Sequence, residues 1–222
     1  MRAFLKIPLL LIVLLGTPPA QTRTNGEQVC GTLGLGKLQL TKADTTILGL
    51  TIGSASLENV RARLGRARIL PSPGSGPLTP TICYVSPSDG TVLTFGTGAM
   101  GGFADVTDFG IWSREAKFPN VSACRTSKWV SRSISTASGI RLGLSVEALS
   151  NIIGAQPGAE HGSVHYEMNC RRKMTLTEIK GFKTVNNWDV SSDPYFDLDS
   201  SVDARVSNSV VIRIEITKIE SY

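Results

Sequence analysis

The side chains of this sequence that could gather a metal ion lie in one short segment. His161 and His165 are the two histidines of the chain, and Glu160 and Glu167 flank them. In an extended strand, positions 161 and 165 share a face, so two imidazoles could converge on one ion. A catalytic zinc needs three protein ligands, and the spacing names no third. We therefore interpret the segment as a turn leading into an edge strand. A metal-dependent hydrolase that uses the His161/His165 region is the alternative hypothesis.

Motifs for nucleophilic catalysis and for phosphate binding are missing or incomplete. The sequence has no Gly-x-Ser-x-Gly elbow to position a catalytic serine. The glycine-rich stretch 96–102 lacks the Lys-Ser/Thr pair of a phosphate-binding loop, and it lies between two predicted strands. It is better explained as a hairpin loop. The sequence thus predicts a non-enzymatic protein without a metal or another cofactor.

The first residues of the chain, 1–20, predict a secretory signal peptide. Arg2 and Lys6 form a positive start, 9–15 form an apolar stretch, and small residues lead to a cleavage site after Ala20. The apolar run is only about half of the roughly 20 residues that span a bilayer. We therefore expect cleavage, no stable membrane insertion, and a secreted or periplasmic mature protein.

The organisation of the chain follows from a short segment that occurs twice, at 56–65 and at 145–154. Each copy begins with a serine and a glutamate two residues later, continues with apolar residues at helical spacing, and ends in glycine. Serine is a preferred helix N-cap, and glycine commonly ends a helix in a left-handed turn. Self-similarity at a fixed offset indicates two copies of one supersecondary unit. The sequence therefore predicts two equivalent short helices.

Predicted strands follow each of these helices. They span 81–85, 91–95 and 106–112 after the first helix, and 164–170, 195–198 and 210–219 after the second. Further extended segments are predicted before the helices, at 33–40 and 129–134. A capping box formed by Thr175 and Glu178 predicts an extra helix over 175–183. The fold class is α+β, with two tandem repeats, 21–118 and 119–222, each packing short helices on one face of an antiparallel β-sheet.

The four cysteines, Cys30, Cys83, Cys124 and Cys170, are expected to form two disulfides in an exported protein. No pair of them has the spacing of zinc ligands. Each predicted unit has one cysteine before its helix and one after it. The repeat therefore predicts the pairs Cys30–Cys83 and Cys124–Cys170.

The repeated motif of Ser-apolar-Glu, helix and closing Leu/Ile-Gly before antiparallel strands resembles the β-lactamase inhibitor protein superfamily. That superfamily includes tandem-repeat secreted inhibitors and the small lipoprotein of the outer-membrane barrel-assembly machine. The segment from Gly143 to Gly154 carries the best match. The resemblance implies short helices packed on an antiparallel sheet and a function in binding other proteins.

The charge of the chain is mildly positive, since the formal net charge of +5 includes Arg2 and Lys6 of the signal peptide. The densest basic clusters are 61–68 and 171–173. Neither alternates with aromatic residues as single-stranded nucleic-acid surfaces do, so no nucleic-acid partner is expected. An acidic protein or a membrane surface is the alternative to simple solvated edges.

The candidate interface is the sheet face that the helices leave uncovered. Strand alternation places Asp108 and Trp112 there in the first unit. In the second unit it places Val211, Arg213, Glu215 and Thr217 there. The sequence thus predicts a protein-binding module whose partner is another protein at the cell envelope or outside the cell. A structural component of the cell envelope is a further alternative.

Overall fold

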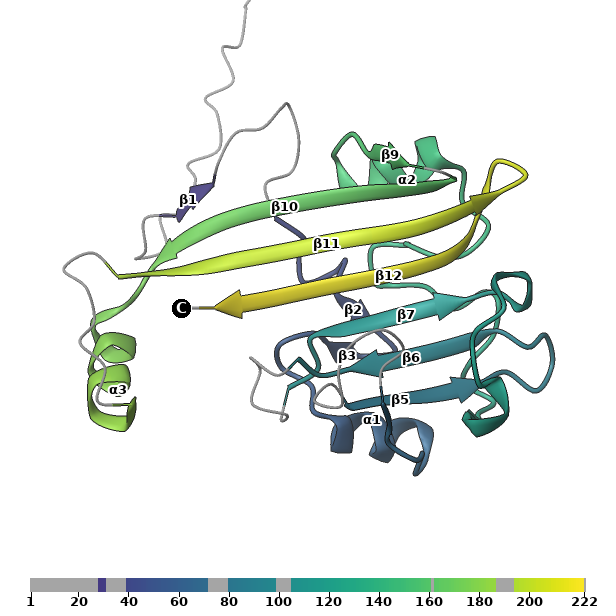
Figure 1. The fold of residues 1–222 in the computed structure, drawn as a ribbon, viewed down its shortest axis with the longest axis horizontal. Coiled ribbons are helices and arrows are strands. Elements are labelled where there is room, and N and C mark those ends of the chain that lie inside the picture. The colour runs from purple at the N-terminus through teal and green to yellow at the C-terminus, as the bar shows by residue number, and fades with distance from the viewer. Residues whose placement is uncertain are drawn as a thin grey trace, which may run out of the picture.

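A computed structural model gives the fold of residues 28–30, 39–71, 80–98, 105–160, 162–186 and 194–221. The expected signal peptide at 1–20, His161, and most of the expected strand at 33–40 lie outside these described residues. The described part of the chain is an α+β structure, organised by one long antiparallel sheet (Figure 1).

Eight strands follow one another across this sheet. Their order is β1 (Gln28–Cys30), β10 (Ser163–Lys173), β11 (Tyr195–Ser207), β12 (Val210–Ser221), β7 (Asp108–Trp112), β6 (Val92–Gly96), β5 (Pro80–Val85) and β4 (Leu70–Pro71). Two short strands are added beside this path, β8 (Arg125–Thr126) parallel to β5 and β9 (Gly158–Glu160) antiparallel to β10. A separate small hairpin consists of β2 (Thr46–Ile47) and β3 (Leu50–Thr51).

The two halves of the chain meet at the pairing of β7 with β12. Ile111 lies opposite Ile214, and Gly110 lies opposite Glu215, in antiparallel register. The expectation of one sheet for each half is therefore wrong, because the last strand of the first half pairs directly with the last strand of the second. This pairing satisfies backbone groups that two separate sheets would leave exposed at their edges. Each half still presents a helix followed by three principal antiparallel strands.

The two short helices form where the sequence predicts them, as α1 (Leu57–Leu64) and α2 (Val146–Ile153). The side chain of Ser56 accepts a hydrogen bond from the backbone N–H of Asn59, and Ser145 accepts one from that of Ala148. These contacts satisfy N–H groups that lack partners inside the helix. The expected left-handed turn occurs at Gly154. Gly65 also has a positive φ but an extended ψ.

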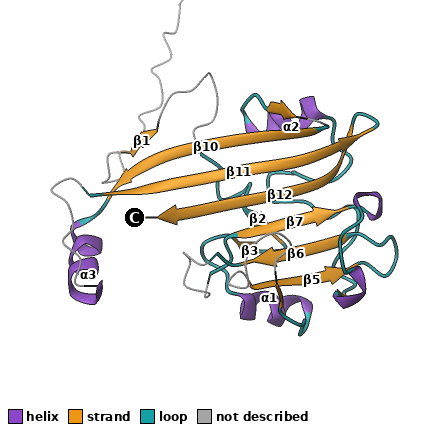
Figure 2. Ribbon diagram, viewed as in Figure 1, coloured by secondary structure: helices purple, strands orange, loops and turns teal. Residues whose placement is uncertain are grey.

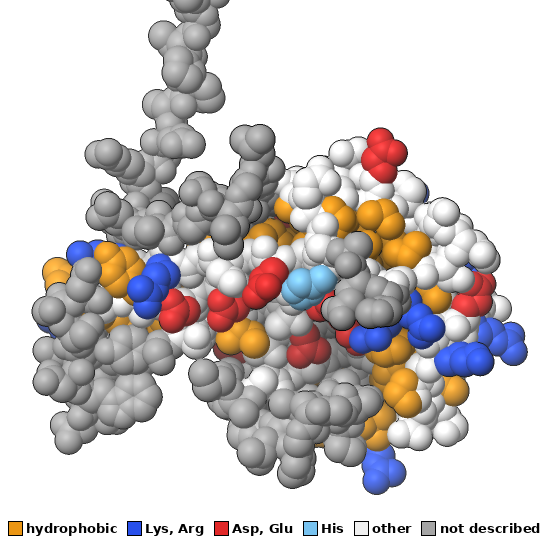
Figure 3. Space-filling view, turned by 45° about the horizontal axis from the view of Figure 1, so that its top comes forward, with side chains coloured by type: hydrophobic (Ala, Val, Ile, Leu, Met, Phe, Trp, Pro, Cys, Tyr) orange, Lys and Arg blue, Asp and Glu red, His pale blue; other side chains and the backbone are white. Residues whose placement is uncertain are grey.

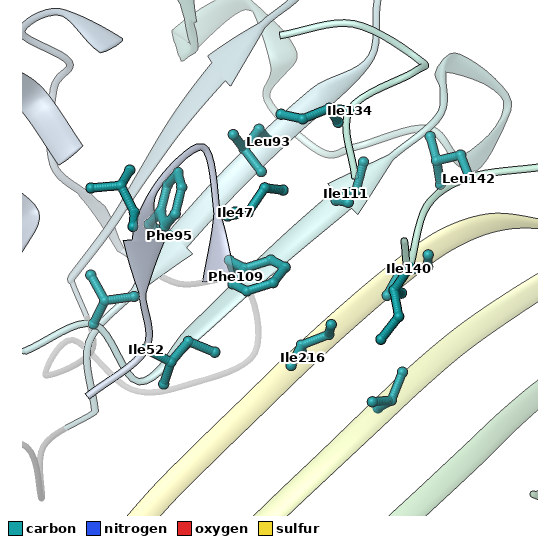
Figure 4. Close-up of a cluster of buried hydrophobic side chains, with 14 of the residues drawn as sticks. Ile47, Ile52, Leu93, Phe95, Phe109, Ile111, Ile134, Ile140, Leu142 and Ile216 are labelled. Carbon is teal, nitrogen blue, oxygen red and sulfur yellow. The ribbon is translucent and has the colours of Figure 1, made fainter. Parts of the chain in front are cut away.

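The main core covers one face of the sheet and includes residues of both helices; Figure 4 shows the part of it that lies beside β2, β3 and residues 134–142. The expected helix positions are all buried, namely Val60, Leu64, Leu149 and Ile153. They belong to the same cluster as sheet residues such as Phe109 and Ile216, which Figure 4 labels. Because one apolar cluster contains residues of both helices and of both halves of the sheet, the two halves share a core.

A buried tyrosine ties each helix to the sheet. The Tyr84 hydroxyl on β5 donates a hydrogen bond to the carbonyl of Gly65 at the end of α1, at 2.7 Å. The Tyr166 hydroxyl on β10 lies 2.9 Å from the hydroxyl of Ser150 in α2. Both rings are fully buried. Burial raises the pKa of both phenols, that of Tyr84 to about 12. The hydroxyls therefore stay protonated as hydrogen-bond donors at neutral pH.

The extra helix forms as α3 (Leu176–Asn186), and it extends from one end of the sheet, between β10 and β11 (Figure 2). The predicted capping box is present, because the Glu178 carboxylate accepts from the Thr175 backbone N–H at 2.7 Å. Arg172 binds Glu178 through two hydrogen bonds and also pairs with Glu220. None of the described helices is long and apolar enough to cross a membrane.

The predicted disulfide pairing is wrong, because Cys83 is bonded to Cys124. The neighbouring residues explain the pairing, since Tyr84 of β5 lies opposite Arg125 of β8 in a parallel bridge. That bridge brings the two preceding cysteines to a Cα–Cα distance of 4.9 Å. Cys170 is also disulfide-bonded, and its backbone lies opposite that of Cys30 in the β1–β10 ladder. The symmetric pairs Cys30–Cys83 and Cys124–Cys170 are therefore both excluded.

Two further differences concern local structure. Residues 129–134 form turns instead of the expected extended segment. Strand β11 runs to Ser207, well beyond the predicted end at 198, and it pairs along nearly its whole length with β12. The extension of β11 follows from its pairing with β10 and β12, which local propensity does not encode. Short 3₁₀ helices, η2 (Arg114–Ala116) and η3 (Val121–Ala123), lie between β7 and β8.

Candidate functional site

The face of the sheet opposite the main core carries a hollow of about 270 Å³ at the pairing of β7 with β12. We call it the Trp112 hollow. Its lining includes five of the six residues predicted for the uncovered face, Asp108, Trp112, Arg213, Glu215 and Thr217, together with Thr81, Thr94, Gly110, Phe118 and Asp203. The structure thus brings together residues that are more than 100 positions apart in the chain.

Glycine makes room for the hollow. A Cβ atom at Gly110 would lie 2.7 Å from Oγ1 of Thr94 and 2.8 Å from Nε1 of Trp112. Because real Cβ atoms do not approach neighbours so closely, any larger residue would push the Trp112 ring or the Thr94 side chain aside. Gly96 plays a similar part, since a Cβ there would lie 2.5 Å from both carboxylate oxygens of Asp108. The absence of two side chains therefore shapes this part of the sheet face.

An aromatic wall borders the hollow. The Trp112 ring packs edge-on against the Phe118 ring, with centroids 5.1 Å apart. The guanidinium of Arg213, the residue opposite Trp112 on β12, lies 4.1 Å from the centre of the indole ring. Arg213 also pairs with Glu215 on its own strand. The Arg213 side chain is therefore held in place by a cation–π contact and an ion pair.

Two N–H groups of this wall have no acceptor. Nε1 of Trp112 and Nε of Arg213 are inaccessible to solvent, and neither has a hydrogen-bond partner in the part of the chain that the structure describes. A buried donor without an acceptor costs roughly 1–3 kcal/mol. Among the described residues, these two donors therefore form a local energetic cost on the sheet face.

Carboxylates dominate the charge of the hollow. Asp108, Asp203 and Glu215 line it, against Arg213 as the cation of the lining. Burial raises the pKa of Asp108, and the nearby Glu215 carboxylate raises it further, while the Thr107 hydroxyl, which donates to Asp108 at 3.1 Å, lowers it. Arg213 is one cation beside three carboxyl groups, so it balances only part of the negative charge that the lining carries when these groups are ionised.

The same acidic character continues onto β10 and β11. His165 Nδ1 lies 2.6 Å from a carboxylate oxygen of Asp203, and His165 Nε2 lies 3.8 Å from Glu167. In Figure 3, acidic side chains lie in a row beside a histidine, and Lys and Arg side chains gather toward the right-hand end of the view. The described residues contain no group of three potential ligands that could hold a metal ion. His161, the other residue of the predicted metal cluster, lies outside the described residues.

One predicted member of the uncovered face is misplaced. Val211 is fully buried and belongs to the main core. The register between β11 and β12 shifts at Arg205 and Val206, so that β12 has one extra residue, Ile212. A β-bulge of this kind reverses the alternation on one side of it. Arg213, Glu215 and Thr217 lie beyond the bulge and keep the predicted face.

Sequence reasoning missed Asp203, which adds the third carboxylate. Asp203 lies on β11, opposite Glu215 of β12 on one side and opposite His165 of β10 on the other. The expected strand at 195–198 ended before it, although Val202 and Ala204 alternate with it in the sequence. Extending the period-two pattern across residues 198–204 would have placed Asp203 on the face of Glu215.

Comparison with known proteins adds no relative. Neither protein-family models, nor curated proteins, nor solved structures give a match to this chain.

Proposed function

We propose that this chain is a secreted or periplasmic, non-enzymatic protein-binding module that holds its partner on the sheet face carrying the Trp112 hollow. The observation that carries the proposal is the composition of this hollow. It combines a half-buried tryptophan and arginine in contact, two N–H donors for which the described residues offer no acceptor, and carboxylates around Gly110. Tryptophan and arginine are enriched among the residues that dominate protein–protein binding energy.

The disulfides support a location outside the cytoplasm. Cys83–Cys124 is formed and Cys170 is disulfide-bonded, and such bonds persist in oxidising compartments. This agrees with the signal peptide that residues 1–20 predict. The partner is then another protein at the cell envelope or outside the cell.

A tandem arrangement of two related units is part of the proposal. Both halves present a serine-capped helix followed by antiparallel strands, and in both halves a buried tyrosine of the sheet contacts the helix region before it. These features support a relationship to the β-lactamase inhibitor protein superfamily, whose tandem members bind proteins. Superposition of the two halves after an experimental structure determination would test this relationship.

A photo-crosslinking experiment tests the binding face. Thr217 lines the hollow and is half-exposed, so replacing it with benzoylphenylalanine puts a reactive group there. We expect a specific crosslink to an envelope or secreted protein of the source organism. The same reporter at the exposed residue Glu147, on helix α2, is the matched control and should give no such product.

Competition makes the test specific. Excess unlabelled protein should suppress the crosslink, whereas a variant with Trp112→Ala and Arg213→Ala should compete at least about tenfold less well, the equivalent of about 1.4 kcal/mol. Circular dichroism must show that this variant is folded. Equal competition by the folded variant, or equal crosslinking from position 147, would refute the proposal.

A further inference from the structure

A second surface, at the outer edge of β5, has the opposite charge. We call it the Trp129 patch and define it by Arg63, Arg66, Arg125, Lys128 and Trp129. All five residues are exposed. Arg63 lies in α1 and Arg66 just after it, whereas Arg125 lies in β8 and the other two residues lie in the turn that follows β8. The fold thus joins segments about 60 residues apart.

Specific contacts hold the patch together. Nη1 of Arg125 donates a hydrogen bond to the backbone carbonyl of Arg66 at 3.0 Å. Its guanidinium passes over Gly65, where a Cβ would lie 2.8 Å from Nε. The Arg63 guanidinium and the Lys128 ammonium lie 5.3 and 5.5 Å from the centre of the Trp129 ring. The patch is therefore an organised cluster around one aromatic ring.

The described residues of the protein do not neutralise the cations of the patch. No described residue forms an ion pair with Arg63, Arg66, Arg125 or Lys128. Glu58, the nearest acidic residue of α1, is paired with Arg61 instead. Four positive charges held close together repel one another and attract an acidic surface. The patch has the charge of a binding site for carboxylates.

Trp129 indicates what kind of acidic partner fits. Its side chain is 49% exposed, which is unusual for so large an apolar group, and exposed Ile69 (47%) follows the cationic segment at the end of α1. The Arg63 and Lys128 cations lie near the ring, so Trp129 belongs to a charged cluster and not to the broad apolar face that a membrane-surface helix presents. Arginine stacked on tryptophan is instead typical of protein–protein hot spots.

We infer that the Trp129 patch binds an acidic segment of a protein, in which carboxylates pair with the arginines and an apolar side chain packs on Trp129. This surface lies at the edge of the sheet where β8 pairs with β5, and it shares no residue with the Trp112 hollow at the pairing of β7 with β12. The inference is therefore independent of the proposed function, and either can fail without the other. The protein would then have two binding surfaces of opposite charge.

A labelled peptide of repeated Glu-Asp-Leu triplets is the probe, and fluorescence anisotropy with the full mature chain is the assay. We expect saturable binding that weakens as NaCl is raised from about 50 to about 500 mM. Trp129→Ala and the double variant Arg63→Glu/Lys128→Glu should each weaken binding at least about tenfold. The matched control is Lys42→Glu/Arg141→Glu, which makes the same change in net charge at exposed residues elsewhere and should stay within about twofold.

Three results would overturn the inference. An equal loss in the control variant would show that net charge alone attracts the peptide. Unchanged binding by the folded patch variants would place the peptide elsewhere. Tighter, Trp129-dependent binding to phosphatidylglycerol vesicles than to the peptide, absent with phosphatidylcholine vesicles, would assign the patch to a membrane surface.

Discussion

Removal of the Cys83–Cys124 disulfide is expected to destabilise the protein strongly. The bond joins residues 41 positions apart. On the loop-entropy model, a closed loop of this length lowers the entropy of the unfolded chain enough to stabilise the native state by about 4 kcal/mol. For a protein of this size, that loss corresponds to a fall in Tm of about 8–16 °C.

Urea denaturation of the Cys83→Ala and Cys124→Ala single variants and of the double variant measures this effect. Each single substitution already breaks the bond, so the double variant should be about as stable as the less stable single variant. Cys83 is also buried, and its single variant should therefore be the less stable of the two. The reasoning would be refuted by a loss below about 1 kcal/mol in the double variant, or by losses of the single variants that simply add.

Three other predictions follow from the ionisable and hydroxyl groups. Because the pKa of Asp108 is raised in the folded protein, the protonated carboxyl stabilises the fold below the pKa of the unfolded chain, and this stabilisation is lost as the pH rises. Urea titrations should show that Asp108→Asn gains stability relative to the wild type as the pH rises from 3 to 7. The hydrogen bonds from Arg172 lower the pKa of Glu178 to about 2, so this carboxylate stabilises α3 above about pH 4.5 and loses its effect as the pH falls toward 2. Backbone hydrogen exchange in α3 should therefore be faster in Glu178→Gln than in the wild type at pH 7, and equally fast in both near pH 2. Tyr84→Phe and Tyr166→Phe should each lower the free energy of unfolding by about 1 kcal/mol and add in the double variant, because each removes one buried hydroxyl contact in a different half; losses near zero would show that water replaces the hydroxyl.

The helices of this protein were predictable because their signals are local. Ser56 and Ser145 cap the helices, and the spacing of Val60 and Leu64 identifies the buried side. All of this information lies within about ten consecutive residues. The predicted α3 formed for the same reason, since its capping box needs only Thr175 and Glu178.

The disulfide and the full lining of the hollow depend on contacts between distant segments. Cys83 meets Cys124 because β8 pairs in parallel with β5, and nothing in the neighbourhood of either cysteine specifies that bridge. Alternation correctly placed Arg213 and Glu215 on the face of Trp112. It failed at Val211, because the bulge at Ile212 appears only when β11 and β12 are aligned.

The pairing of β7 with β12 also has a consequence for the order in which the protein can fold. The paired segments, 108–112 and 213–217, are about 100 residues apart in the sequence. Because a chain is synthesised from its amino terminus onward, β5, β6 and β7 can pair with one another long before β12 has been made. During that time β7 has an unpaired edge, which offers its backbone N–H and C=O groups to any other extended chain. The last strand therefore closes the edge at which the unfinished protein is most exposed to aggregation, and a chain truncated before β12 would keep that edge open.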